Sequence, residues 1–338
     1  MNPRASRRSS RRRAATRRGR LVAALLLGPV GFAAGIGVVT AVRGLAPGNQ
    51  GHFERQGGYR LTQPLLDYEA AQHIEAAAPF LKQKIEALIN ETRRAGRAHH
   101  VSVYFRDLAN GPWFGIHERE PFTPASLLKV PILMAYLKLA ESDPGLLSRP
   151  LAYHGEARLP EAVVSPSRLI EPGTPYAIEE LLERMIVQSD NRATNALVTA
   201  LDEAALHQTF TSLGVPVPDE RTLDDPITVK AYATFFRILF NATYLSPAMS
   251  EQALEWLATS EFTDGLVAGV PAGVVVAHKF GERSAAGAWT TQLHDCGIVY
   301  CPQRPYLLCV MTRGDQVDAL SGTIRDISRL VYGGICGG

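Results

Sequence analysis

Cysteine is absent from the first 295 residues of this 338-residue sequence, and all four cysteines lie in its last 43 residues. Their pattern, C-x4-C followed by C-x7-C, does not match the usual spacing of zinc ligands. The nine histidines are scattered and form no H-E-x-x-H motif. We therefore expect no metal and no cofactor, and a zinc hydrolase is poorly supported.

Acidic residues are absent from the first 20 positions, which carry nine arginines. The rest of the chain has 26 Lys and Arg against 33 Asp and Glu, a net charge of −7, whereas the whole chain has +2. A mildly acidic body argues against nucleic acid as the main partner. With 46% apolar and 20% charged residues, the composition is that of a globular protein with one large or two modest domains.

Charge of either sign is absent from residues 21–42, LVAALLLGPVGFAAGIGVVTAV. A helix of this length can span a hydrocarbon core of roughly 30 Å, and the preceding arginines would keep the N-terminus inside. We interpret residues 1–20 as a basic cytoplasmic tail and 21–42 as a transmembrane signal anchor, with the body outside the membrane. A cleaved signal peptide, which would leave a secreted protein, is the alternative, and twin-arginine export through residues 17–22 is a further route.

The cysteines have two interpretations in an exported protein. They could form one or two disulfides, and two bridges would allow three pairings. They could equally stay buried as free thiols. None of them has the surroundings of a catalytic nucleophile. The four are Cys296, Cys301, Cys309 and Cys336.

The remaining chain divides into a linker and one long domain. Residues 43–63 are polar and Gly-rich, which predicts a flexible linker, and residues 64–338 follow as one domain without internal repeats. Periodicity predicts helices at 64–94, 177–187, 190–206, 227–240 and 320–332, and strands within 100–117, 273–281, 288–301 and 306–314. Because strands lie at both ends, we expect one sheet built from distant segments. The first and last helices would cover it, a helical lobe would be inserted, and a pocket would lie between lobe and sheet.

A serine and a lysine at helical spacing carry the first chemical signal. In 121-PFTPASLLKVPILMAYLKLA-140, Lys129 follows Ser126 by three residues, so the two share a helix face. Serine is a poor nucleophile without an adjacent base, and burial among apolar groups lowers the pKa of a lysine until it can act as one. An exposed lysine beside a chance serine is the ordinary interpretation of S-x-x-K alone.

Two further motifs follow along the chain. Ser189 and Asn191 belong to a Ser-Asp-Asn triplet that opens a helix, where an ordinary N-cap is the alternative interpretation. A serine there could relay a proton, and the amide could bind a substrate amide. Lys279 and Gly281 end a β-branched strand; the lysine could hold a substrate carboxylate while the glycine permits close approach. A solvent-exposed lysine at a strand end is the alternative.

The ordered set S-x-x-K, S-D-N and K-x-G resembles the class A β-lactamase-like serine hydrolases over roughly residues 64–335. The resemblance implies an α+β fold, in which an antiparallel sheet is flanked by the N- and C-terminal helices and carries an inserted all-helical lobe. It also implies that Ser126 is acylated, that Lys129 is the activating base, and that Lys279 binds the carboxylate. Ser189 and Asn191 would line the opposite wall, and the backbone N–H groups of Ser126 and Glu282 would form the oxyanion hole.

The sequence departs from this family's pattern in two places. Phe280 stands where the family usually has Thr or Ser, so a hydroxyl that contacts the substrate is missing. No E-x-x-L-N motif supplies the glutamate that activates the hydrolytic water in class A enzymes. The nearest text, 218-PDERTLDDP-226, offers Glu220 either as part of a degenerate motif or as a solvated carboxylate in a shortened loop. With the shortened loop, acylation should work but hydrolysis of a β-lactam acyl-enzyme should be slow.

Three functions follow. The first is an exported, monomeric serine hydrolase that cleaves a β-lactam or related amide through an acyl-serine intermediate. The second is a peptidoglycan D,D-peptidase of the penicillin-binding type, acting on cell-wall peptides. The third is a non-hydrolytic sensor of β-lactams or muropeptides, which the intact serines and lysines disfavour.

Overall fold

The computed structural model describes residues 53–68, 79–109, 111–155, 166–217, 226–284, 291–302 and 304–337. By its internal contacts the chain divides after Pro47, and all described residues belong to the second unit. The predicted basic tail and signal anchor lie outside the described residues, and so does Glu220. Within the described part, no helix combines the length and apolar character needed to cross a bilayer.

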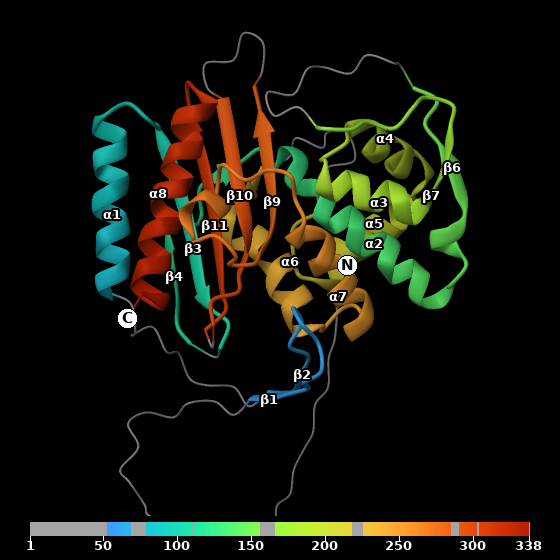
Figure 1. Ribbon diagram of the computed structural model, residues 1–338, viewed down its shortest axis with the longest axis horizontal. Helices are drawn as coiled ribbons and strands as arrows, with labels where there is room; N and C mark the ends of the chain where they lie inside the picture. Colours follow the sequence, from blue (N-terminus) through green and yellow to red (C-terminus); the bar gives the residue numbers. More distant parts are fainter. Residues whose placement is uncertain are drawn as a thin grey trace, which may run out of the picture. The chain divides into compact units, whose positions relative to one another are not determined.

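A five-stranded antiparallel sheet forms the centre of this unit (Figure 1). Its spatial order is β4-β3-β11-β10-β9, so strands from the beginning and the end of the unit are neighbours. This arrangement confirms the predicted sheet of distant segments. The strands are β3 (His100–Asp107), β4 (Trp113–Ile116), β9 (Val276–Arg283), β10 (Thr291–Val299) and β11 (Tyr306–Gly314).

The central strands are apolar on both faces because helices cover both sides of the sheet. On β11, Leu308 and Val310 belong to one core cluster, whereas Leu307 and Met311 belong to the other. Successive side chains of a strand point to opposite faces, so a strand covered twice reads as a continuous apolar run rather than an alternation. The run 306-YLLCVMTRG-314 has this pattern.

Helices α1 (Pro79–Arg94) and α8 (Val317–Cys336) pack on each other and cover one face of the sheet (Figure 1). Helix α6 (Val229–Asn241) contacts β3, β10 and β11 on the other face. The first and last helices therefore flank the sheet as predicted, although α1 is described only from Pro79.

The helical lobe adjoins the face of α6. It consists of α2 (Lys129–Ser142), α3 (Ile178–Val187), α4 (Asn191–Ala200), α5 (Glu203–Ser212) and α7 (Pro247–Ala258), with short strand pairs β5–β8 (Pro121–Phe122, Ile227–Thr228) and β6–β7 (Pro150–Ala152, Pro175–Ala177), and 3-10 turns η1 (Ala125–Leu128) and η2 (Leu146–Ser148). A third 3-10 turn, η3 (Val267–Gly269), packs on α8 instead. The predicted single helix over 190–206 is wrong. Asp202 has extended backbone and caps α5 through the amide of Ala204, which ends α4 and begins a new helix.

The segment preceding α1 differs from the sequence prediction. Strand β1 (Phe53–Arg55) pairs with β2 (Leu65–Tyr68), so the helix predicted from residue 64 is wrong at its beginning. β1 falls inside the predicted linker. The carboxylate of Glu251 on α7 accepts hydrogen bonds from the backbone amides of Arg60, Leu61 and Thr62, which fixes this hairpin to the lobe. Such a contact between distant segments leaves no periodic signal in the sequence.

One disulfide links the end of α8 to the turn between β10 and β11. Cys301 and Cys336 are bonded, whereas Cys296 and Cys309 are buried thiols. The last two are directly opposite each other on β10 and β11. The cysteines thus divide between the two alternatives that the sequence leaves open.

Candidate active site

The serine of the first motif lies in a strained turn just before α2. Ser126 is in η1 and is half-buried, and Lys129 begins α2. Ala125, which precedes the serine, has φ of 50°, a left-handed conformation that costs energy for any residue with a Cβ. Strain of this kind concentrates at functional sites. Pro124 begins the turn and has no amide proton to satisfy.

Lys129 is buried, with an exposed fraction of 3%. Its Nζ donates to the carbonyl oxygen of Ser189 at 2.7 Å, to Ser189 Oγ at 2.9 Å and to Asn191 Oδ1 at 2.8 Å. Burial lowers the pKa of Lys129 to about 7, and the charge of Asp190 partly opposes that effect. The lowered pKa that the sequence predicts is therefore present. All three hydrogen bonds cross to the second motif, and none joins Lys129 to Ser126.

The hydroxyl of Ser189 lies between two lysines. Its Oγ accepts from Lys129 at 2.9 Å and from Lys279 at 3.0 Å. A hydroxyl oxygen has two lone pairs, so these two bonds use both of them and leave the O–H free to donate elsewhere. Ser189 also has φ of 56°, so a second positive-φ residue belongs to the site.

Asp190 holds the second motif in place. Its carboxylate caps α4 by accepting from the amides of Arg192 and Ala193, and its other oxygen accepts from the amide of Ile170 at 2.8 Å. The ordinary capping interpretation is thus correct for the aspartate of the triplet. The cap also sets the direction of Ser189 and Asn191 on either side of it, so capping and the site geometry depend on the same residue.

The third motif lies on β9, an outer strand of the five-stranded sheet. Lys279 and Gly281 share one face of the strand. A Cβ on Gly281 would lie 2.8 Å from the carbonyl oxygen of Pro124 and 3.1 Å from the amide nitrogen of Leu127. The glycine is required because β9 passes directly against η1. The sequence analysis explained Gly281 by the close approach of a ligand, whereas the structure shows the close approach of η1. This contact brings Lys279 beside the Ser126 turn.

Lys279 is fully buried, and its Nζ also donates to the carbonyl oxygen of Phe280 at 3.1 Å. Burial is the main reason that its pKa lies well below the ordinary lysine value. The neighbouring charge of Lys129 lowers it further, whereas Asp295 and Glu282 act in the opposite direction. Burial disfavours the ammonium form of both lysines, and a bound anion would favour it, so the site suits a negatively charged group.

Phe280 occupies the position where the resemblance expects a hydroxyl. Its ring stacks on Phe262 with centroids 4.3 Å apart, and both rings belong to the core cluster beneath α1 and α8. Lys279 Nζ lies 4.1 Å from the centroid of the Phe280 ring, a cation–π distance. The aromatic ring therefore supports the lysine but offers no hydrogen bond to a ligand.

Two buried side chains that carry no recognisable sequence signal support the Ser126 turn. Tyr232 of α6 donates from its hydroxyl to the carbonyl oxygen of Leu127 at 3.0 Å. His294 of β10 bonds the carbonyl oxygen of Thr123 through Nε2 at 3.0 Å and accepts from the amide of Thr312 through Nδ1. Burial lowers the pKa of His294 to about 4, so the ring is neutral with its proton on Nε2.

The remaining predicted site residues have less defined surroundings. Asn191 is exposed at the first position of α4, where its side-chain oxygen faces Lys129. Glu282 is half-buried on β9, next to Gly281 and hence close to η1. The structure thus brings Ser126, Lys129, Ser189, Asn191, Lys279 and Gly281 to one junction of β9, η1 and the start of α4.

A serine beside buried lysines, at the junction of an antiparallel sheet and a helical lobe, defines a serine hydrolase of the β-lactamase type. Comparison with known proteins agrees: the chain belongs to the Beta-lactamase enzyme family, whose pattern it matches over residues 79–335.

Similar proteins come from both sequence and structure comparisons. The extended-spectrum β-lactamase PER-1 of Pseudomonas aeruginosa is 28% identical over 258 residues, covering 70% of this chain and 81% of that protein. A mutant of PBP-A, in an acyl-enzyme complex with penicillin-G, has 26% identity and a TM-score of 0.65, covering 78% of this chain and 98% of that one. A β-lactamase from Chitinophaga pinensis DSM 2588 has 25% identity and a TM-score of 0.65, with coverage of 75% and 99%.

Proposed function

We propose that this protein is an exported hydrolase that opens a β-lactam or a related amide through a covalent intermediate on Ser126. The observation that carries the proposal is the shared hydroxyl of Ser189, which bridges a lysine with a pKa of about 7 to a second lysine suited to an anion. Family membership and the likeness to a penicillin acyl-enzyme support the same chemistry. In this proposal the reaction begins with Lys129 in its neutral amine form.

Acylation would proceed through proton transfer and addition. Neutral Lys129 accepts the hydroxyl proton of Ser126, and the serine oxygen attacks the amide carbonyl carbon. The resulting oxyanion receives hydrogen bonds from the backbone N–H groups of Ser126 and Glu282. η1 supports the first of these roles because the leading amides of a helical turn lack partners within the helix.

Collapse of the tetrahedral intermediate breaks the carbon–nitrogen bond. Ser189, whose O–H remains free to donate, protonates the departing nitrogen and recovers a proton from the Lys129 ammonium at 2.9 Å. A substrate carboxylate beside Lys279 would offset the burial cost that lowers the pKa of that lysine, so Lys279 would bind it as an ammonium. The side-chain amide of Asn191 would form a hydrogen bond with the substrate amide.

A D,D-peptidase is the second candidate, since the chain lacks the E-x-x-L-N motif and has a structural neighbour in PBP-A. Hydrolysis of the acyl-enzyme needs a base for the water, and Glu220 is the candidate that the sequence offers. In the peptidase, another base would complete turnover on a cell-wall peptide. The charge pattern of residues 1–42 supports a membrane-anchored enzyme with its active site outside the cytoplasm, or a secreted one after cleavage.

Intact-protein mass spectrometry with benzylpenicillin, combined with nitrocefin turnover, tests this function. We expect a mass increase equal to one penicillin, located on Ser126 by peptide mapping and abolished in Ser126→Ala. Ser142→Ala, at the far end of α2, is the matched control and should be acylated normally.

The lifetime of the adduct separates the two candidates. Rapid loss of the adduct with nitrocefin turnover supports a β-lactamase, and a persistent adduct with release of D-alanine from a peptide ending in D-Ala-D-Ala supports the peptidase. Absence of any adduct, with turnover unchanged in Ser126→Ala, would refute the serine mechanism.

A further inference from the structure

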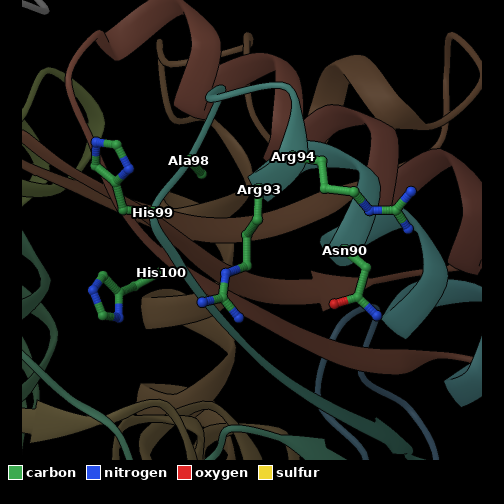
Figure 2. Close-up of a pocket in the computed structure, with 6 residues that line it drawn as sticks. All are labelled: Asn90, Arg93, Arg94, Ala98, His99 and His100. Atoms are coloured by element: carbon green, nitrogen blue, oxygen red, sulfur yellow. The ribbon is translucent and has the colours of Figure 1, made fainter.

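A polar hollow lies at the end of α1, where the chain turns into β3 (Figure 2). Its volume is about 570 Å³, within the range of small-molecule sites. Figure 2 shows Arg93 extending from α1 between His100 on one side and Asn90 on the other. The lining residues are Asn90, Arg93, Arg94, Ala98, His99 and His100.

The two guanidinium groups of this hollow are available to a ligand. Arg93 and Arg94 have no side-chain hydrogen bond or ion pair among the described residues, and both are exposed. They are not needed to cap the helix, because the amides of Ala95, Gly96 and Arg97 bond the last carbonyl oxygens of α1.

Two carboxylates are paired with the histidines of the hollow. His99 Nε2 lies 3.0 Å from Asp315, and His100 Nδ1 lies 2.6 Å from Glu120. Asp315 and Glu120 therefore contact the two histidines and form no ion pair with Arg93 or Arg94. The hollow is therefore lined by two unpaired guanidinium groups, two imidazoles and an amide.

The hollow is separate from the catalytic site. His100 pairs with Arg313 at one end of β3, whereas Lys279 is in register with Cys296, Cys309 and Tyr104 across the sheet. His100 and Lys279 are three strands apart across the sheet and four residues apart along the strands, which corresponds to about 20 Å. A ligand could occupy one without displacing a ligand from the other.

We propose that this hollow binds the phosphate ester group of a polar ligand, such as a phosphorylated sugar unit. Two guanidinium groups match the charge of a phosphomonoester, and arginine binds phosphate oxygens through paired hydrogen bonds. Apart from Ala98 the lining is polar, so the remainder of the ligand is hydroxylated rather than apolar, and the space exceeds that of a phosphate ion alone. The phosphate can belong to a soluble sugar phosphate or to a lipid headgroup.

Isothermal titration calorimetry of the full chain with glucose 6-phosphate tests this site, with glucose as the uncharged control. Arg93→Ala and Arg94→Ala should each weaken binding about tenfold, the effect of one lost charge-assisted hydrogen bond. Lys82→Ala removes the same charge from the same helix outside the hollow and should leave binding unchanged. Added salt should weaken binding.

Two further measurements complete the test. Co-sedimentation with phosphatidylglycerol vesicles, against phosphatidylcholine vesicles, identifies whether a lipid headgroup is the source of the phosphate, and inorganic phosphate should compete in either case. Nitrocefin turnover should be equal in all variants, so a failure here is distinct from a failure of the catalytic proposal. Equal binding by wild type and both arginine variants, or no binding of any phosphate ester, would overturn the site.

Discussion

At the scale of single residues, Lys129 shows how burial lowers the pKa of a lysine. The same S-x-x-K spacing on an exposed helix would leave an ordinary ammonium group, because water would stabilise its charge. Here the side chain is 3% exposed and makes three hydrogen bonds to the second motif. A pKa of about 7 means that the amine and ammonium forms are both populated at neutral pH, which suits a group that must take up and then return a proton.

We expect the rate of acylation by benzylpenicillin to follow the neutral form of Lys129. The rate should rise about tenfold per unit of pH below about 7 and level off above it, because the pKa of the base is lowered to that value. Lys129→Ala should reduce the plateau roughly a hundredfold to ten-thousandfold. Stopped-flow measurement across this range gives the profile. Lys138→Ala, on the same helix, should keep it, and a profile without a step near 7 would exclude Lys129 as the base.

The sequence predicted which side chains of the three motifs meet better than it predicted what supports them. Motif order predicted Ser126, Lys129, Ser189 and Lys279 as members of one site, and the structure brings them to one junction. Tyr232 and His294 could not be found that way, since each reaches a backbone carbonyl oxygen of a segment far away in the chain. An N-cap was the alternative interpretation of the Ser-Asp-Asn triplet, and Asp190 is that cap, but its bond to Ile170 depends on tertiary packing.

At the scale of elements, the approach of β9 to η1 decides the geometry of the site. The strand was predicted from its β-branched residues, and the Ser126 segment was predicted as part of an apolar helix, which in the structure begins only at Lys129 after the turn η1. Their contact was not predicted, because Gly281 faces the backbone of Pro124 and Leu127 across more than 150 positions of sequence. Local periodicity also predicted one helix where the cap at Asp202 divides two. It predicted a helix over Leu65–Tyr68, which is instead a strand paired with a segment about 10 residues earlier.

We expect Gly281→Ala to reduce activity more than stability. The added Cβ would lie 2.8 Å from a backbone oxygen that cannot rotate away, so β9 must move from η1. Overpacking of this kind costs about 1–3 kcal/mol of unfolding free energy, whereas displacement of Lys279 should lower kcat/KM on nitrocefin about a hundredfold. Urea unfolding and steady-state kinetics provide the two values.

Gly333→Ala is the control for this substitution. Gly333 lies in α8 with open space around the position of a Cβ, so alanine should preserve activity and slightly stabilise the helix. Equal kcat/KM for Gly281→Ala and wild type would show that the contact between β9 and η1 does not position the lysine.

At the scale of the whole unit, one covalent bond connects the last helix to the sheet. The disulfide from Cys301 to Cys336 closes a loop with a sequence separation of 35 residues, and it holds the end of α8 against the β10–β11 turn. Closing a loop of this length restricts the unfolded chain and is worth about 2–4 kcal/mol. Composition alone could not choose this pairing, because three pairings and the free thiols were all compatible with the spacing.

Replacing both bridged cysteines with serine should lower the unfolding free energy by about 2–4 kcal/mol, because the unfolded chain regains freedom. Urea denaturation at neutral pH measures the difference. Dithiothreitol should shift the wild-type midpoint to that of the double variant and leave the variant unaffected. A wild-type midpoint insensitive to the reductant would contradict a stabilising bridge.

The position of β11 has a consequence for the order in which the protein folds. β11 lies between β3 and β10, yet it is made about 200 residues after β3. Before β11 forms, the pairs β3–β4 and β9–β10 have no strand to join them into one sheet. We therefore expect a chain that ends before residue 306 to lack hydrolytic activity even though it contains Ser126, Lys129 and Lys279.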